Sequence, residues 1–190
     1  MGDIKNKNPL SDEELVYKIV ETNNTHLFAV LYDRYSSVVY NKCYGFSKNK
    51  EEAQDLTHDV FIRLFVKLRT FKGKSKFSTW LYSFTYNFCV NYVQRDAHKK
   101  KEKKTIVTDQ VKDTTSFDEI DDATLFELKS DKLAKAMQII DPNDKMILLM
   151  KYQDDLSIKE ISEVLEIGES AVKMRLKRAK EKVVNTYNEL

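Results

Sequence analysis

The sequence contains few residues that turn a chain sharply. Only four glycines and two prolines occur in 190 residues. Folds built from β-strands need such residues at their many tight turns, whereas helices joined by a few turns do not. Apolar residues make up 42% of the chain and aromatic residues 11%, which is enough to fill a core. The composition therefore predicts an all-α protein.

Long apolar runs and clustered cysteines are also missing. The first residues, MGDIKNKNPLSDEELV, hold no apolar signal core, and no stretch approaches the ~20 residues of a membrane-spanning helix. Cys43 and Cys89 stand apart in apolar segments, where a thiol is usually a small buried hydrophobic group. This pattern predicts neither a disulfide framework nor a zinc site. We expect a cytoplasmic protein without a metal or cofactor.

The charge is nearly balanced overall, but the cations gather in two runs. The formal net charge is +2. Residues 63–76 contain six cations and no acid, and residues 173–182 contain six cations with one acid, Glu181. A solvated helix face gives a run of this kind as well. Two such runs in one chain favour contacts with nucleic acid at two places.

Helical periodicity divides the chain at a polar segment. Apolar residues recur at three- and four-residue spacing over residues 11–96 and again over 131–190. Residues 97–130 hold a lysine-rich run and then a Thr- and Asp-rich stretch without sustained periodicity. We predict two small helical domains, 11–96 and 131–190, joined by a flexible linker. Three pairs have the pattern of helix starts: Ser11 with Glu14, Asp141 with Pro142, and Ser157 with Glu160.

The segment from Leu156 to Val183 has the pattern of a helix-turn-helix. A short turn that contains Gly168 separates two amphipathic helices, as a steep helix crossing requires. The second helix has a narrow apolar stripe that predicts its buried face. That stripe consists of Val172, Leu176, Ala179 and Val183. A plain amphipathic hairpin with a solvated basic face is the alternative at this point.

The second helix of this motif has the composition of a recognition helix. Such a helix reads base edges near its N-terminus, and cations along its flanks neutralise phosphates. We expect base contacts from Ser170 and Lys173, with Glu169 as an acceptor from cytosine. We expect Arg175, Lys177 and Arg178 to hold the DNA backbone. The predicted upstream DNA-binding set is Glu169, Ser170, Lys173, Met174, Arg175, Lys177 and Arg178.

These motifs resemble the extracytoplasmic-function sigma factors over nearly the whole chain. The helix-turn-helix and its lead-in, IDPNDKMILLMKYQDDLSIKEIS, are similar to the family's domain for the minus-thirty-five element. EEAQDLTHDVFIRLF, residues 51–65, is similar to the helix that docks on the polymerase clamp. FKGKSKFSTWLYSFTYNFCVNYVQRD, residues 71–96, is similar to the loop and helix that open and read the minus-ten element. Met174 departs from the family, in which a small polar residue is more usual.

The resemblance implies a transcription-initiation factor that is not an enzyme. Its partners would be core RNA polymerase, promoter DNA and an anti-sigma factor. Aromatic faces beside cations suit the melted strand, because they stack with and neutralise unstacked nucleotides. Several of these rings are spaced like core residues of a helix, so the loop is the stronger candidate. The predicted melted-strand set is Phe71, Lys72, Lys74, Lys76, Phe77, Trp80, Asn87 and Asn91.

Asp55 and Asp59 lie four residues apart on one predicted helix face, with His58 beside them. A carboxylate-bridged metal site needs such a motif from at least two helices, and here it occurs once. We therefore interpret the acids as a surface for a basic partner, which the resemblance identifies as the polymerase clamp. The predicted polymerase-binding set is Glu52, Asp55, Asp59, Phe61 and Arg63.

Two other classes of protein make different demands on a sequence. A stand-alone helix-turn-helix regulator would dimerise and bind a palindromic site without polymerase. An enzyme would need a paired acid and base, an activated nucleophile, a phosphate-binding glycine loop or a set of metal ligands, and the sequence contains none of these.

Overall fold

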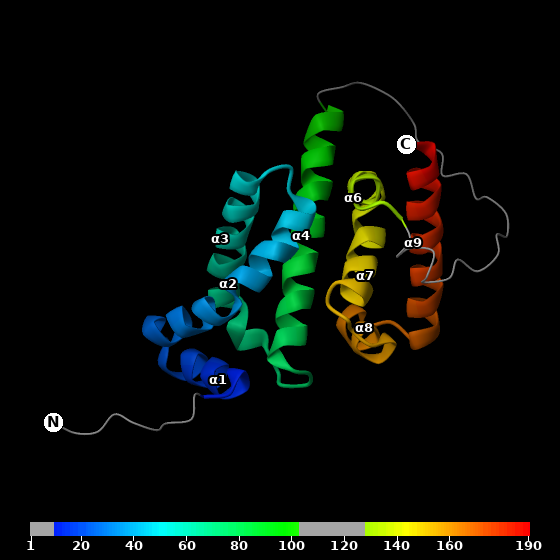
Figure 1. Ribbon diagram of the computed structural model, residues 1–190. Coiled ribbons are helices and arrows are strands. Elements are labelled where there is room, and N and C mark those ends of the chain that lie inside the picture. Colours follow the sequence, from blue (N-terminus) through cyan, green and yellow to red (C-terminus); the bar gives the residue numbers. More distant parts are fainter. Residues whose placement is uncertain (1–9, 103–127) are drawn as a thin grey trace. The chain divides into compact units, whose positions relative to one another are not determined.

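The computed structural model describes residues 10–102 and 128–190, and the side chains of 97–102 are not part of the description (Figure 1). Within these ranges every regular element is a helix, which confirms the all-α prediction. None of these helices is long and apolar enough to cross a membrane. The elements are α1 (Asp12–Thr22), α2 (Thr25–Phe46), α3 (Lys50–Lys67), η1 (Leu68–Thr70), α4 (Phe77–Glu102), α6 (Ser130–Ile139), α7 (Pro142–Tyr152), α8 (Ile158–Leu165) and α9 (Glu169–Glu189).

The chain forms two compact units, Met1–Tyr86 and Asn87–Leu190. Helix α4 runs without a break to Glu102, so it continues beyond residue 96, where the sequence analysis placed the end of the first domain. Residues 103–127, which make up most of the predicted linker, lie outside the described residues.

The first unit has a core between α2, α3 and the start of α4, and α1 packs against α2. Cys43 is fully buried there, as the sequence predicted. The same core holds a charged residue that the sequence did not indicate. Lys42 is only 1% exposed, and its ammonium lies 3.9 Å from the ring centre of Tyr82 and 4.8 Å from that of Tyr86. These ring faces compensate part of the cost of burying the charge.

In the other part of the chain, α6, α7 and α8 pack around α9. The four residues of the predicted stripe, Val172, Leu176, Ala179 and Val183, are the residues of α9 that are buried. This confirms the predicted inner face of the second helix. The predicted short turn with Gly168 lies between α8 and α9, where Glu166 adopts the left-handed conformation with φ 53° and Gly168 is extended.

Local hydrogen bonds begin the helices where the sequence predicted. Ser11 and Glu14 form a capping box at α1, and Ser157 and Glu160 form another at α8. Asp141 accepts from the N–H of Asn143, and Pro142 occupies the first turn of α7. Each cap satisfies N–H groups that have no partner inside their helix.

Two neighbouring positions on α3 test this description of the core. Leu64 is 0% exposed and Ile62 is 56% exposed. We expect Leu64→Ala to lower the free energy of unfolding by about 2–5 kcal/mol, because it leaves a cavity. Ile62→Ala should change it by less than about 0.5 kcal/mol. Urea unfolding monitored by the fluorescence of Trp80, the single tryptophan, measures both, and equal losses would contradict the assigned burial.

Candidate nucleic-acid interface

The first turns of helix α9 are exposed to solvent. It begins directly after Gly168, and no side chain caps its N-terminus. The first N–H groups of a helix carry partial positive charge and favour an anion such as a phosphate. Glu169, Ser170, Lys173 and Met174 are all exposed on these turns, and the buried stripe holds α9 against the other helices.

The cations of α9 lie on two different flanks. Ser170, Lys173 and Lys177 follow one another at three- and four-residue steps, and therefore share one side of the helix. Arg175, Arg178 and Lys182 form a second row with the same spacing. The predicted division into base contacts from Ser170 and Lys173 and backbone contacts from Arg175 and Arg178 matches these two flanks, whereas Lys177, predicted to hold the backbone, lies on the flank of the base-contact candidates.

The second row lines a cavity of about 410 Å³ beside the first turn of α7. Asn143 and Asp144 of α7 are part of the lining, and Lys182 forms an ion pair of 2.5 Å with Asp144. Arg175 and Arg178 have no acid within ion-pair distance among the residues that the structure describes. Their guanidinium groups are exposed and free to meet a phosphate or a carboxylate.

The loop between η1 and α4 carries the second group of cations (Figure 1). Lys72, Lys74 and Lys76 are exposed. Gly73 lies at φ 66°, a conformation that side chains with a Cβ rarely adopt. The loop therefore presents three ammonium groups around one sharp turn.

The aromatic residues next to this loop pack mainly against one another. Phe77 is 0% exposed, and its ring centre lies 5.4 Å from that of Phe71 and 5.9 Å from that of Trp80. Trp80 also stacks on Phe84 at 5.7 Å. Phe71 and Trp80 keep part of their surface exposed. The prediction that Phe77 stacks on a base is wrong for this conformation, because no face of its ring reaches solvent.

The two asparagines predicted to contact the melted strand lie on α4. Asn87 and Asn91 are one turn apart, and both are exposed. Their amides therefore point out of the core and are accessible to a partner, although Asn87 also interacts with groups of its own chain.

The predicted polymerase-binding residues separate into core and surface. Phe61 is buried, with its ring centre 4.5 Å from that of Tyr32, so its assignment to a binding surface is wrong. Glu52 turns back and accepts a hydrogen bond from the N–H of Lys48. Asp55, Asp59 and Arg63 are exposed.

Two apolar residues that the sequence analysis did not select lie on the same face as the acids. On α3, Ile62 is 56% exposed and Val66 58% exposed. Ile62 lies one turn beyond Asp59, and Val66 lies one turn beyond Ile62. An apolar pair of this size in water is typical of a surface that meets a partner. The signal was present in the sequence, because Ile62 and Val66 are four residues apart and outside the core stripe of α3.

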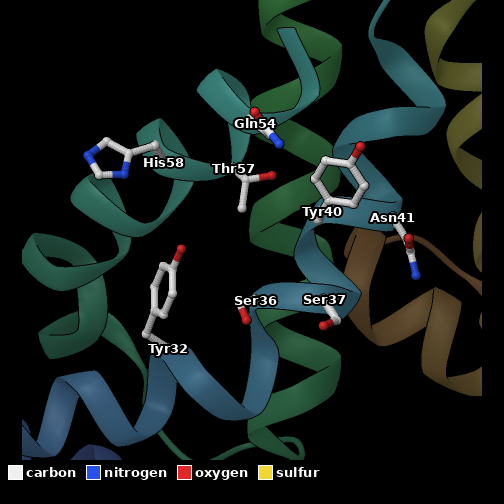
Figure 2. A pocket seen from close by; sticks show the side chains of 8 residues that line it. All are labelled: Tyr32, Ser36, Ser37, Tyr40, Asn41, Gln54, Thr57 and His58. Carbon is white, nitrogen blue, oxygen red and sulfur yellow. The ribbon is translucent and has the colours of Figure 1, made fainter. Parts of the chain in front are cut away.

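A polar groove of about 630 Å³ lies between α2 and α3. Figure 2 shows side chains of α2 along one side and side chains of α3 along the other. Hydroxyl, amide and imidazole groups line it, and the sequence did not predict this grouping because the residues come from two separate helices. The lining residues are Tyr32, Ser36, Ser37, Tyr40, Asn41, Gln54, Thr57 and His58.

Comparison with protein families identifies the class that this arrangement represents. Residues 31–99 match Sigma-70 region 2, and residues 130–183 match Sigma-70, region 4. The chain is 30% identical over 175 residues to the ECF RNA polymerase sigma factor SigW of Bacillus subtilis, covering 86% of this chain and 90% of SigW. It is 28% identical to SigM of the same organism, covering 83% of this chain and 93% of SigM.

Solved structures share the fold. The structure of CnrH in complex with the cytosolic domain of CnrY is similar with a TM-score of 0.62 at 17% identity, over 94% of this chain and 97% of that one. The sigma factor RpoE of Bartonella quintana, in complex with the anti-sigma factor NepR, is similar with a TM-score of 0.59 at 13% identity, over 85% and 96% of the two chains.

These matches cover most of the chain on both sides of the undescribed segment. The chain belongs to the extracytoplasmic-function (ECF) sigma factors of the sigma-70 family. It is a promoter-recognising initiation factor that works with core RNA polymerase and has no catalytic activity of its own.

Proposed function

We propose that this ECF sigma factor uses three separate surfaces during initiation, and we assign residues to each. The observation that carries the assignment is that solvent-accessible charged, polar and apolar side chains gather in three places: on α9, on the loop before α4 and on α3. The duplex-reading surface is Glu169, Ser170, Lys173, Met174 and Lys177 of α9; the strand-capture loop is residues 71–76; and the clamp-facing stripe is Asp55, Asp59, Ile62 and Val66 of α3.

The duplex-reading surface reads the upstream promoter element in the major groove. Ser170 and Lys173 lie on the first turns of α9, where a recognition helix meets base edges. A good bidentate contact discriminates between bases by about 1–3 kcal/mol. Arg175 and Arg178, on the other flank, hold the phosphate backbone and set the register of the helix on the duplex.

The strand-capture loop binds the non-template strand as it opens. Lys72, Lys74 and Lys76 neutralise phosphates, and the exposed edges of Phe71 and Trp80 offer stacking surface to a base. Asn87 and Asn91, which lie further along α4, supply hydrogen bonds to bases. Phe77 supports these rings from within the core and makes no contact with DNA.

The clamp-facing stripe docks on core polymerase. Its aspartates suit a basic partner surface, and Ile62 and Val66 provide the apolar contact that a stable interface has at its centre. The polar groove between α2 and α3 borders this stripe through His58, which precedes Asp59 in the chain. Its hydroxyl and amide groups give the interface directional hydrogen bonds.

We propose that the two DNA-binding surfaces belong to separate domains, residues 11–96 and 131–190, with the segment between them as a tether. We further propose that the protein acts in the cytoplasm, where polymerase and chromosome meet. An anti-sigma factor is a proposed partner, because RpoE of Bartonella quintana has been solved with one. No residue of this chain is assigned to that contact.

Transcription with purified components tests the strand-capture loop. Wild-type chain with core polymerase should give transcripts from a promoter and none from scrambled DNA. The double variant Lys72→Glu, Lys74→Glu should lower promoter output about ten-fold or more, because it repels the strand. Lys135→Glu, an exposed position on α6, is the matched control and should keep wild-type output. Full activity of the double variant would contradict the assignment.

Binding to core polymerase tests the clamp-facing stripe. Asp55→Lys should weaken the affinity about ten-fold, equivalent to ~1.4 kcal/mol, through lost charge complementarity. Ile62→Ala should also weaken it while the fold stays intact. The control is Glu21→Lys, an exposed acid at the end of α1. Fluorescence anisotropy of labelled chain measures all affinities, and unchanged values for both α3 variants would remove α3 from the interface.

Holoenzyme binding to promoter variants separates the two flanks of α9. Lys173→Ala should relax the preference at one base position by about 1–3 kcal/mol. Arg178→Ala should weaken binding to all sequences alike and reduce the slope of affinity against salt by about one. The reverse pattern would exchange the roles of the two flanks.

A further inference from the structure

Helix α1 lies outside the part of the chain that matches Sigma-70 region 2, which begins at residue 31. It is nevertheless firmly packed, because Leu15, Val16 and Ile19 are buried. Its first turn contains three consecutive acids, Asp12, Glu13 and Glu14. Each of these acids contacts a different part of the protein.

Asp12 and Glu14 fix the helix itself. Asp12 forms an ion pair with Arg34 of α2 at 2.6 Å and accepts a hydrogen bond from the hydroxyl of Tyr35. Burial and this hydrogen bond raise the pKa of Tyr35, so the hydroxyl keeps its proton at neutral pH. Glu14 accepts from the N–H of Ser11 and completes the capping box of α1.

Glu13 reaches a different helix. Its Oε1 accepts a hydrogen bond of 2.9 Å from the N–H of Phe77, which is 64 residues away and is the first residue of α4. The residue before Phe77 is Lys76, and a lysine side chain has no acceptor with which to cap a helix. The start of α4 thus receives its cap from α1, and the negative charge also suits the helix N-terminus.

The capped residue is the junction between the strand-capture loop and α4. The loop ends at Lys76, and the buried ring of Phe77 contacts Phe71 at the beginning of the loop and Tyr35 of α2 at 5.6 Å. Asp12 holds Tyr35 from the other side. Glu13 therefore holds the backbone N–H of Phe77, and its neighbour Asp12 holds Tyr35, whose ring packs against Phe77.

We propose that Glu13 is a positioning residue for promoter opening: it holds the first turn of α4, and with it the strand-capture loop, in the conformation that receives the melted strand. This inference rests on the proposed function of the loop. Glu13 acts through Phe77 and makes no contact with DNA. Helix α1 is accordingly part of the opening machinery, although it lies outside the matched sigma region.

The test compares Glu13→Ala with Glu13→Gln in the full chain. Glutamine keeps an oxygen that accepts from the N–H of Phe77, whereas alanine removes the cap. We expect Glu13→Ala to lower transcription from a duplex promoter about five-fold, the factor that corresponds to ~1 kcal/mol for a lost helix cap. Glu13→Gln should stay within about two-fold of wild type, because only the charge contribution to the cap is lost.

Two other acids of α1 serve as controls. Glu14→Ala removes an acid from the same turn and opens the capping box of α1, but leaves the bond to Phe77 intact. Glu21→Ala removes an exposed acid from the other end of α1. Both should transcribe at close to the wild-type level. If either is as defective as Glu13→Ala, stability or charge of α1 explains the effect and the proposal is overturned.

Trp80 supplies a second readout that needs neither DNA nor polymerase. It lies one turn into α4 and contacts Phe77, so a loosened first turn exposes it to a soluble quencher. Acrylamide should quench its fluorescence more strongly in Glu13→Ala than in wild type or Glu13→Gln. Unchanged quenching with unchanged transcription would reject the cap. Increased quenching with normal transcription would reject the role in opening. Full activity of the double variant Lys72→Glu, Lys74→Glu would instead reject the proposed function of the loop.

Discussion

The packing around Phe77 connects the core of the first unit to the basic loop of residues 71–76. The ring lies among Tyr35, Phe71 and Trp80, and the backbone N–H is bound by Glu13 of α1. Burying a side chain of this size contributes roughly 1.5–3 kcal/mol, and edge-to-face partners add to it. Because the loop ends directly before Phe77, the position of its exposed lysines depends on how the buried ring of Phe77 packs.

Helix α9 also joins a buried face to an exposed cationic surface. Four small or branched apolar residues, three or four positions apart, hold it against α6, α7 and α8, and its exposed surface carries cations. Such a narrow stripe leaves room for two independent cationic flanks. One flank stands free at the start of the helix, and the other lines the cavity beside α7, where Lys182 is already paired with Asp144. A single run of basic residues in the sequence thus lies in two different surroundings on the helix.

Helix α3 combines core and surface within a few residues. Phe61 and Leu64 are buried, whereas Ile62 and Val66 between and beyond them are exposed. Exposed apolar side chains of this kind are costly in water and favour a partner that covers them. Beside Asp55 and Asp59 they give the stripe both an apolar contact and a charge preference, which together favour a particular partner over nonspecific association.

Features that depend on residues a few positions apart could be predicted from the sequence. The capping boxes at Ser11 and Ser157 and the buried stripe of α9 were of this kind, because a cap spans three residues and a helix face repeats every three or four. The three- and four-residue spacing of apolar residues and the scarcity of glycine and proline predicted the all-α fold in the same way. The resemblance to a family depended on contiguous motifs.

What the sequence could not determine was which apolar or charged residue faces a neighbour from a distant segment. Phe61 and Phe77 looked like binding residues and are core, while Ile62 and Val66, to which the sequence assigned no role, are exposed on the surface. The cap from Glu13 to Phe77 and the groove between α2 and α3 join residues from separate helices. The sequence by itself determined the helices and their caps through short-range hydrogen bonds and periodicity. Only the tertiary structure decided which faces were covered, because burial depends on how distant segments pack.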